Sequence, residues 1–140
     1  MTATTNDDVG GGRSEVCVDF VTFDEANDEW AVYVVEDPPW PKDEEGWKAR
    51  LSALQDRVLD IADAAIDGGV SARFPESRGR RVRIQVDSPT GTPERLQSFV
   101  EKLQRYLATD PTSSRAVQAS SHVEGLRVLT GRQMGRFGGC

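Results

Sequence analysis

The chain has 140 residues, of which 37% are hydrophobic and 29% are charged, and its formal net charge at pH 7 is −6. This length suits a single domain with one hydrophobic core and terminal segments outside it. The negative charge is concentrated in residues 16–50, which carry ten acidic and three basic side chains. Such a surface repels phosphate groups, so we expect no nucleic-acid partner for the folded part.

The two cysteines, Cys17 and Cys140, lie at opposite ends of the chain, so we expect no structural disulfide between them. Residues 1–5 do not resemble a signal peptide, and no apolar run is long enough to span a membrane. The final Cys140 also lacks the three residues that follow a prenylated cysteine. These features predict a cytoplasmic protein without a membrane or lipid anchor.

The first 35 residues predict an arm followed by a hairpin. Residues 1–15 contain three consecutive glycines and few apolar side chains, which is typical of a disordered arm. Residues 16–23 alternate between two faces and predict a strand. After a polar turn, residues 30–35 are rich in aromatic and β-branched side chains and predict a second strand. The two strands are expected to pair.

Prolines at positions 38, 39 and 41 then interrupt the chain, because proline removes hydrogen-bond donors. A long helix is predicted from Asp43, as its N-cap, to Asp67, with Gly68 and Gly69 as its C-terminal stop. Acidic residues in its first turn favour this start, since the N-terminal end of a helix dipole is positive. Its apolar stripe recurs every three or four residues and consists of Trp47, Leu51, Leu54, Val58, Ile61 and Ala65.

Residues 81–87 alternate again and predict a third strand. Its inward side chains would be those of Val82, Ile84 and Val86, while its arginines would face water. Such alternation is typical of a sheet with helices on one face. We interpret the surrounding basic residues as charges at a sheet edge, where they commonly block unwanted pairing. They are Arg78, Arg80, Arg81 and Arg83.

Thr92, as N-cap, and Pro93, in the first turn, predict the start of a second helix that ends near residue 109. Residues 110–140 are assigned to a flexible tail, within which residues 123–130 are a candidate edge strand weakened by a glycine. The predicted order is β-β-α-β-α with this final strand left open. The fold class is therefore an α+β two-layer sandwich, over residues 16–109, with the helices on one face of a small sheet.

Six stretches of the sequence together carry a resemblance. They are Val18-Asp19-Phe20, Trp30-Ala31-Val32-Tyr33-Val34-Val35-Glu36-Asp37, Trp40, Arg50-Leu51-Ser52-Ala53-Leu54-Gln55-Asp56-Arg57, Phe74-Pro75-Glu76-Ser77 and Val82-Arg83-Ile84-Gln85-Val86-Asp87. In combination they resemble a family of short bacterial proteins known as domain of unknown function 6572. The resemblance covers residues 16–109 and implies a compact bacterial domain, but it implies no catalytic residues. The tail after the second helix departs from the family pattern.

Acidic side chains gather around Trp40 and Trp47 and raise the question of a cation site or a pair of catalytic carboxylates. No calcium-loop spacing with its central glycine is present. Because acids are common at a helix N-terminus, a solvated helix start explains them better, and we expect the tryptophans to pack the loop on the core. The carboxylates are those of Glu36, Asp37, Asp43, Glu44 and Glu45.

His122 is the only histidine, which excludes a metal site built from several histidines of one chain. A dyad of Cys17 and His122 is formally open, but Cys17 lies in a predicted strand without a neighbouring base that would lower the pKa of its thiol. We expect Cys17 to be a small core residue. The sequence predicts no metal, no cofactor and no catalytic residues.

The tail ends in Gly138-Gly139-Cys140, which places a thiol beside residues without side chains. A partner enzyme with a narrow channel would reach this end. Two chemistries fit: modification of Cys140, as in ribosomally made modified peptides, or removal of Cys140 and activation of Gly139, as in ubiquitin-like sulfur carriers. An unstructured end, or an added handle for thiol coupling, remains the plain alternative.

The sequence therefore predicts a non-enzymatic binding or scaffold domain that presents its tail to a partner enzyme acting on Cys140. We rank this above the sulfur-carrier hypothesis, because two long helices fit a ubiquitin-like fold poorly. The other alternative is a protein-interaction domain with an incidental tail, and a homodimer is compatible with each. The sequence offers no set of a nucleophile, a base and an orienting group that would form an active site, so we do not predict an enzyme.

Overall fold

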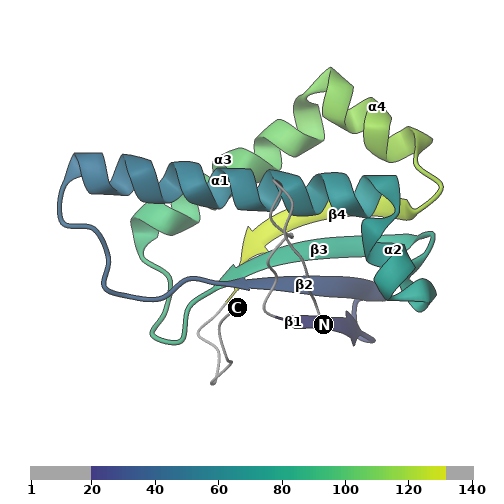
Figure 1. The fold of residues 1–140 in the computed structure, drawn as a ribbon, viewed down its shortest axis with the longest axis horizontal. Coiled ribbons are helices and arrows are strands. Elements are labelled where there is room, and N and C mark those ends of the chain that lie inside the picture. Colours follow the sequence, from purple (N-terminus) through teal and green to yellow (C-terminus); the bar gives the residue numbers. More distant parts are fainter. Residues whose placement is uncertain (1–19, 132–140) are drawn as a thin grey trace, which may run out of the picture.

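The computed structural model describes residues 20–131, which form a two-layer α+β domain with helices on one face of a four-stranded sheet (Figure 1). This confirms the predicted fold class. The strands are β1 (Phe20–Asp24), β2 (Glu29–Val35), β3 (Arg80–Asp87) and β4 (Val123–Thr130). The helices are α1 (Glu44–Asp67), α2 (Gly69–Arg73), α3 (Glu94–Thr109) and α4 (Pro111–Ala119), with a 3-10 turn η1 (Pro75–Ser77).

The strands lie in the sheet in chain order, β1-β2-β3-β4. β1 and β2 form an antiparallel hairpin, whereas β3 is parallel to both β2 and β4. Parallel neighbours need a long crossover, which α1 supplies between β2 and β3, and α3 with α4 between β3 and β4. The final strand left open by the sequence is therefore present, and it forms an edge of the sheet.

Helix α1 begins and ends where its sequence predicts. The side chain of Asp43 accepts a hydrogen bond from the main-chain N–H of Gly46 (2.8 Å), which satisfies one of the free donors of the first turn. Gly68 follows the last helical residue with φ of 99°, a left-handed conformation that residues with a Cβ rarely adopt. None of the helices among residues 20–131 is long and apolar enough to cross a membrane.

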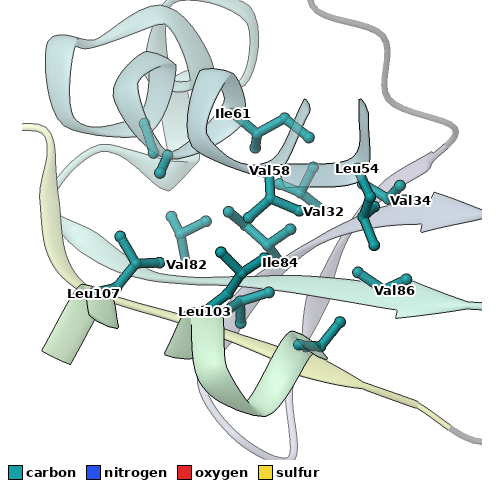
Figure 2. Close-up of a cluster of buried hydrophobic side chains, with 14 of the residues drawn as sticks. Val32, Val34, Leu54, Val58, Ile61, Val82, Ile84, Val86, Leu103 and Leu107 are labelled. Carbon is teal, nitrogen blue, oxygen red and sulfur yellow. The ribbon is translucent and has the colours of Figure 1, made fainter. Parts of the chain in front are cut away.

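The hydrophobic core lies between the sheet and the two long helices (Figure 2). Alternate side chains of three neighbouring strands point into it, in rows such as Val32, Ile84 and Val128, which are paired across the sheet. The helices contribute the stripe predicted for α1 and a second stripe on α3. The most deeply buried helical side chains are those of Leu54, Val58, Ile61, Ala62, Ala65, Leu96 and Val100.

One predicted boundary differs from the structure, and another is untested. The described residues begin inside the first strand, at Phe20, so its predicted start at residue 16 stays a prediction. Thr92 is not the N-cap of α3: the helix begins at Glu94, Pro93 occupies the cap position without a side-chain hydrogen bond, and Thr92 accepts one from Gln97 instead. Sequence spacing alone did not distinguish these two roles of threonine.

The predicted flexible tail is wrong for residues 111–119, whereas the candidate strand at residues 123–130 is confirmed. Pro111–Ala119 is a helix, with Pro111 in its first turn and the Asp110 side chain accepting from the N–H of Ser113 (3.0 Å). Val123–Thr130 is a strand of the sheet, so the folded domain extends well beyond residue 109. Helix α4 buries none of its residues, which is why no apolar stripe indicated it. The predicted arm, residues 1–15, and residues 132–140 lie outside the described part.

Replacing Gly68 by alanine is expected to destabilise the fold more than the same change at Gly79. Both glycines have positive φ, so alanine is strained at each position by about 1–2 kcal/mol. At Gly68 the added Cβ would also lie 2.9 Å from Cε1 of His122, whereas nothing lies within 4 Å at Gly79. Thermal unfolding should give a lower Tm for G68A than for G79A, and His122→Ala should recover part of the loss. Equal Tm values would contradict this packing.

Candidate functional site

The residues that the sequence singled out for chemistry, Gly138, Gly139 and Cys140, lie outside the described part of the chain, as does Cys17. The structure therefore leaves the predictions for them untested. Within residues 20–131, four features carry polar or aromatic side chains in unusual arrangements. They are a stack of indoles, the surroundings of His122, a polar cluster on the sheet and the outer edge of β4.

Trp40 and Trp47 form a stack whose two outer faces are covered by arginines. The indole rings are nearly parallel, at 5°, with centroids 6.2 Å apart. The guanidinium of Arg50 lies 4.8 Å from the centroid of Trp40, and that of Arg95 lies 5.6 Å from Trp47. Both contacts are in the range of cation–π attraction. Since both outer ring faces are occupied, the stack attaches the loop before α1 to the core, where both tryptophans pack.

Arg50 also fixes the path of that loop. It donates hydrogen bonds to a carboxylate oxygen of Glu36 (2.9 Å) and to the main-chain oxygens of Asp37 (2.7 Å) and Pro39 (3.2 Å). Glu36, one of the clustered carboxylates, is thus held by an arginine rather than facing other acids. No group of three or more metal-ligating side chains gathers among residues 20–131.

His122 packs against the C-terminal end of α1. Its ring lies over Gly68, and its Nδ1 is 3.5 Å from the Oγ of Ser71 in α2. Ser71 also donates to the main-chain oxygen of Gly68 (3.3 Å), and the His122 carbonyl accepts from the N–H of Gly79 (3.0 Å). The histidine therefore connects the start of β4 to α2 and to the loop before β3.

A polar cluster lies on the sheet face opposite the helices and consists of Asp24, Glu29, Tyr33, Arg83 and Arg127. Arg83 donates to Asp24 (2.8 Å), Glu29 (3.0 Å) and Tyr33 (3.4 Å), while Arg127 binds both carboxylate oxygens of Glu29. The cluster thereby connects all four strands. It also corrects the interpretation of Arg83 as an edge charge facing water, because β3 is central and Arg83 is only 6% exposed.

The carboxylates of the polar cluster are held in their ionised form. The hydrogen bond from Arg83 lowers the pKa of Asp24 to about 2. Burial raises the pKa of Glu29, but hydrogen bonds from Arg127 and Arg83 outweigh that effect and leave the pKa below its ordinary value. The two acids thus balance the two arginines. A self-neutralised face of this kind does not attract a polyanion strongly.

Asp87, at the end of β3, is almost fully buried on the same face. Burial raises the pKa of its carboxyl group, an effect that the hydrogen bonds from Gln85 reduce. Gly131 passes close by, because a Cβ at this position would lie only 2.2 Å from Oδ1 of Asp87 and 2.0 Å from Nε2 of Gln85. A side chain at this position would require Gln85 and Asp87 to move.

The outer edge of β4 has no neighbouring strand among the described residues. The N–H of Gly131 donates to the Val86 carbonyl of β3 (3.1 Å). Since N–H groups alternate sides along a strand, those of Leu126, Val128 and Thr130 point away from β3. The N–H of Val128 is bound there by the side-chain oxygen of Gln104 (2.7 Å).

A groove of about 500 Å³ runs along this edge, between β4 and α3. Its strand side is formed by Val128, Leu129 and Thr130, and its helix side includes Glu101 and Arg105. We call this groove, together with the outward N–H and C=O groups of β4, the edge groove. It combines main-chain hydrogen-bonding groups with an apolar surface that includes Val100 and Val128 and a rim charged by Glu101 and Arg105. The sequence indicated an edge strand here but not the groove beside it, which depends on how α3 packs against β4.

Comparisons with known protein families, with curated proteins and with solved structures found no match. The resemblance of residues 16–109 to domain of unknown function 6572 therefore stays a prediction. The choice among the four features rests on their geometry. Three of them satisfy their polar groups largely among themselves, whereas the edge groove presents main-chain donors and acceptors outward.

Asp87→Asn is expected to raise the Tm at pH 7 by a few degrees. The pKa of Asp87 is higher in the folded than in the unfolded chain, so the ionised carboxylate destabilises the fold above that folded pKa. This penalty falls as the pH decreases and vanishes below the unfolded pKa, near 4. The gain from D87N should therefore shrink between pH 7 and pH 4. Thermal unfolding of D87N and of the exposed control Asp56→Asn across this range tests it; a gain independent of pH would contradict it.

Proposed function

We propose that this chain is a non-enzymatic, cytoplasmic protein-binding domain that adds an extended segment of a partner to its sheet at β4. The proposal rests on whether the outward main-chain N–H groups of β4 have hydrogen-bond partners. Of the three outward N–H groups, only that of Val128 has a partner among the described residues, and that partner is the side-chain amide of Gln104. A carbonyl of an added strand can replace a side-chain oxygen at this position.

The groove beside β4 supports the same proposal. When a strand is added at an edge, its side chains point alternately to the two faces of the sheet. On the helix face, they would enter the space between β4 and α3, which is lined by Val100 and Val128 as well as by the charges of Glu101 and Arg105. Main-chain pairing would supply affinity, and this groove would supply selectivity.

The other surfaces favour a structural role. The stacked tryptophans are covered by Arg50 and Arg95, and the arginines of the sheet face are neutralised by Asp24 and Glu29. We therefore include no nucleic acid and no membrane among the proposed partners. The edge groove combines unpaired main-chain N–H groups with a lined hollow, which is why the proposal assigns the partner to it.

A photo-reactive amino acid in place of Glu101 is expected to give a covalent adduct in cells that make this protein. Glu101 lines the edge groove, so the probe would contact a strand bound to β4. Thr130→Pro should abolish the adduct, because proline removes an outward donor while the hydrogen bonds to β3 remain. Denaturing electrophoresis followed by mass spectrometry of the adduct measures both results.

Two controls make the experiment decisive. The same probe at exposed Asp56 on α1 should give no adduct, and T130P should retain a Tm close to that of the parent protein. Leu129→Pro, which removes an N–H directed at β3, should instead unfold the domain. An adduct that also forms at Asp56, or one that T130P leaves unchanged, would contradict the proposal, as would the absence of any adduct at Glu101.

A second candidate function concerns the tail. Residues 123–130 form a strand at the sheet edge that we propose as the binding surface, and Gly131, the last described residue, follows it directly. A partner docked on β4 would lie near the start of this segment. We keep the hypothesis that such a partner is an enzyme that modifies Cys140, with processing to Gly139 as the alternative.

Intact-mass measurement of protein from its natural source tests the tail hypothesis. A mass change that maps to Cys140 is expected if a partner enzyme modifies the thiol, and the Cys140→Ser variant should not show it. Loss of one cysteine residue would instead support processing to Gly139. An unchanged mass contradicts both chemistries and leaves the domain as a protein-interaction module.

A further inference from the structure

We infer that the partner at the edge groove is a second copy of this chain, with the two β4 strands paired antiparallel about a two-fold axis. This inference rests on the proposed function, because it names the partner of the same edge. It follows from three properties of the edge groove: the order of side chains along β4, the position of Gln104 and the charges on α3. A two-fold interface requires each of these to be self-complementary.

The order of side chains along β4 favours an axis at Val128. With this centre, Leu126 lies opposite the partner's Thr130, and the outward N–H and C=O groups of both copies face one another. On the open face, Arg127 then lies opposite the partner's Leu129. An axis at Arg127 would instead place two arginines directly opposite each other, which is destabilising.

Gln104 lies at the level of this axis, since its side chain binds the N–H of Val128 (2.7 Å). In the paired state the partner's Val128 carbonyl accepts that N–H. The released amide of Gln104 meets the partner's Gln104, and two amides can each donate to and accept from the other. One helical turn further along α3, Ala108 is exposed and small, so it leaves room for the partner's α3 to approach.

The charges on α3 are self-complementary about the same axis. Glu101 and Arg105 both line the groove, and neither forms an ion pair within residues 20–131. The two copies of α3 would run antiparallel across the axis. With a rise of about 1.5 Å per residue and the axis at Gln104, Glu101 and the partner's Arg105 differ in height by only about 3 Å. The long side chains of Glu101 and Arg105 span this offset. The two-fold axis then gives two identical ion pairs, each between Glu101 of one copy and Arg105 of the other.

Sedimentation equilibrium of the full chain tests this interface. We expect a dimer whose dissociation constant rises at least about tenfold in Glu101→Arg and in Arg105→Glu, because each change places like charges across the axis twice. The double variant E101R/R105E restores opposite pairs and should recover the dimer. T130P should be monomeric with a nearly unchanged Tm. Only a second copy of the same chain predicts rescue by exchanging two charges on one protein.

Several results would overturn the inference. They are a monomer at every concentration reached, a dimer indifferent to the single charge reversals, or a double variant no stronger than the single ones. The photo-crosslinking result separates this failure from that of the proposed function. An adduct of twice the chain mass supports the second copy, whereas an adduct with a different protein at Glu101 rejects the dimer but retains strand addition at β4. The absence of an adduct rejects both.

Discussion

The parallel pairing of β3 with both of its neighbours determines how the rest of the molecule is arranged. Each parallel pair requires a crossover, and α1 and α3 both lie on the same face of the sheet (Figure 1). The apolar residues of β3 must therefore all point to that face, where Val82, Ile84 and Val86 meet the helices. Within residues 20–131 the opposite face carries no helix, and β4 is an edge because no further strand follows it there.

The open face is stabilised by the polar cluster rather than by a second layer of helices. Removing Arg83 from water is costly, and its hydrogen bonds to Asp24, Glu29 and Tyr33 offset that cost only in the observed register. A slip of one residue would direct Arg83 into the hydrophobic core. The cluster thus stabilises one alignment of the strands, and its arginines and carboxylates neutralise one another. This is why we assign binding to the edge and not to the face.

Much of the fold was predictable from local sequence patterns, whereas the candidate site was not. The cap at Asp43, the stripe from Leu51 to Ala65 and the left-handed Gly68 are each encoded within a few neighbouring residues, and the structure confirms them. Helix α4 has no buried residue, and the one large aliphatic side chain in its nine residues is that of Val117, which is too little to indicate a helix packed on the core. The partners of Arg83 are 54 and 59 positions away in sequence, and the hydrogen bond between Gln104 and Val128 spans 24. Such contacts depend on strand order, which composition and spacing do not specify.

The two edges of the sheet differ in a way that limits assembly. Within the described residues, β1 has five residues, whereas β4 has eight beside the edge groove. If β4 paired with the β1 of another copy, each addition would expose a fresh edge, and the contact would propagate into an open filament. Pairing of β4 with itself consumes the longer edge of both copies and stops at two. Self-pairing at β4 therefore favours a closed dimer over an open fibre.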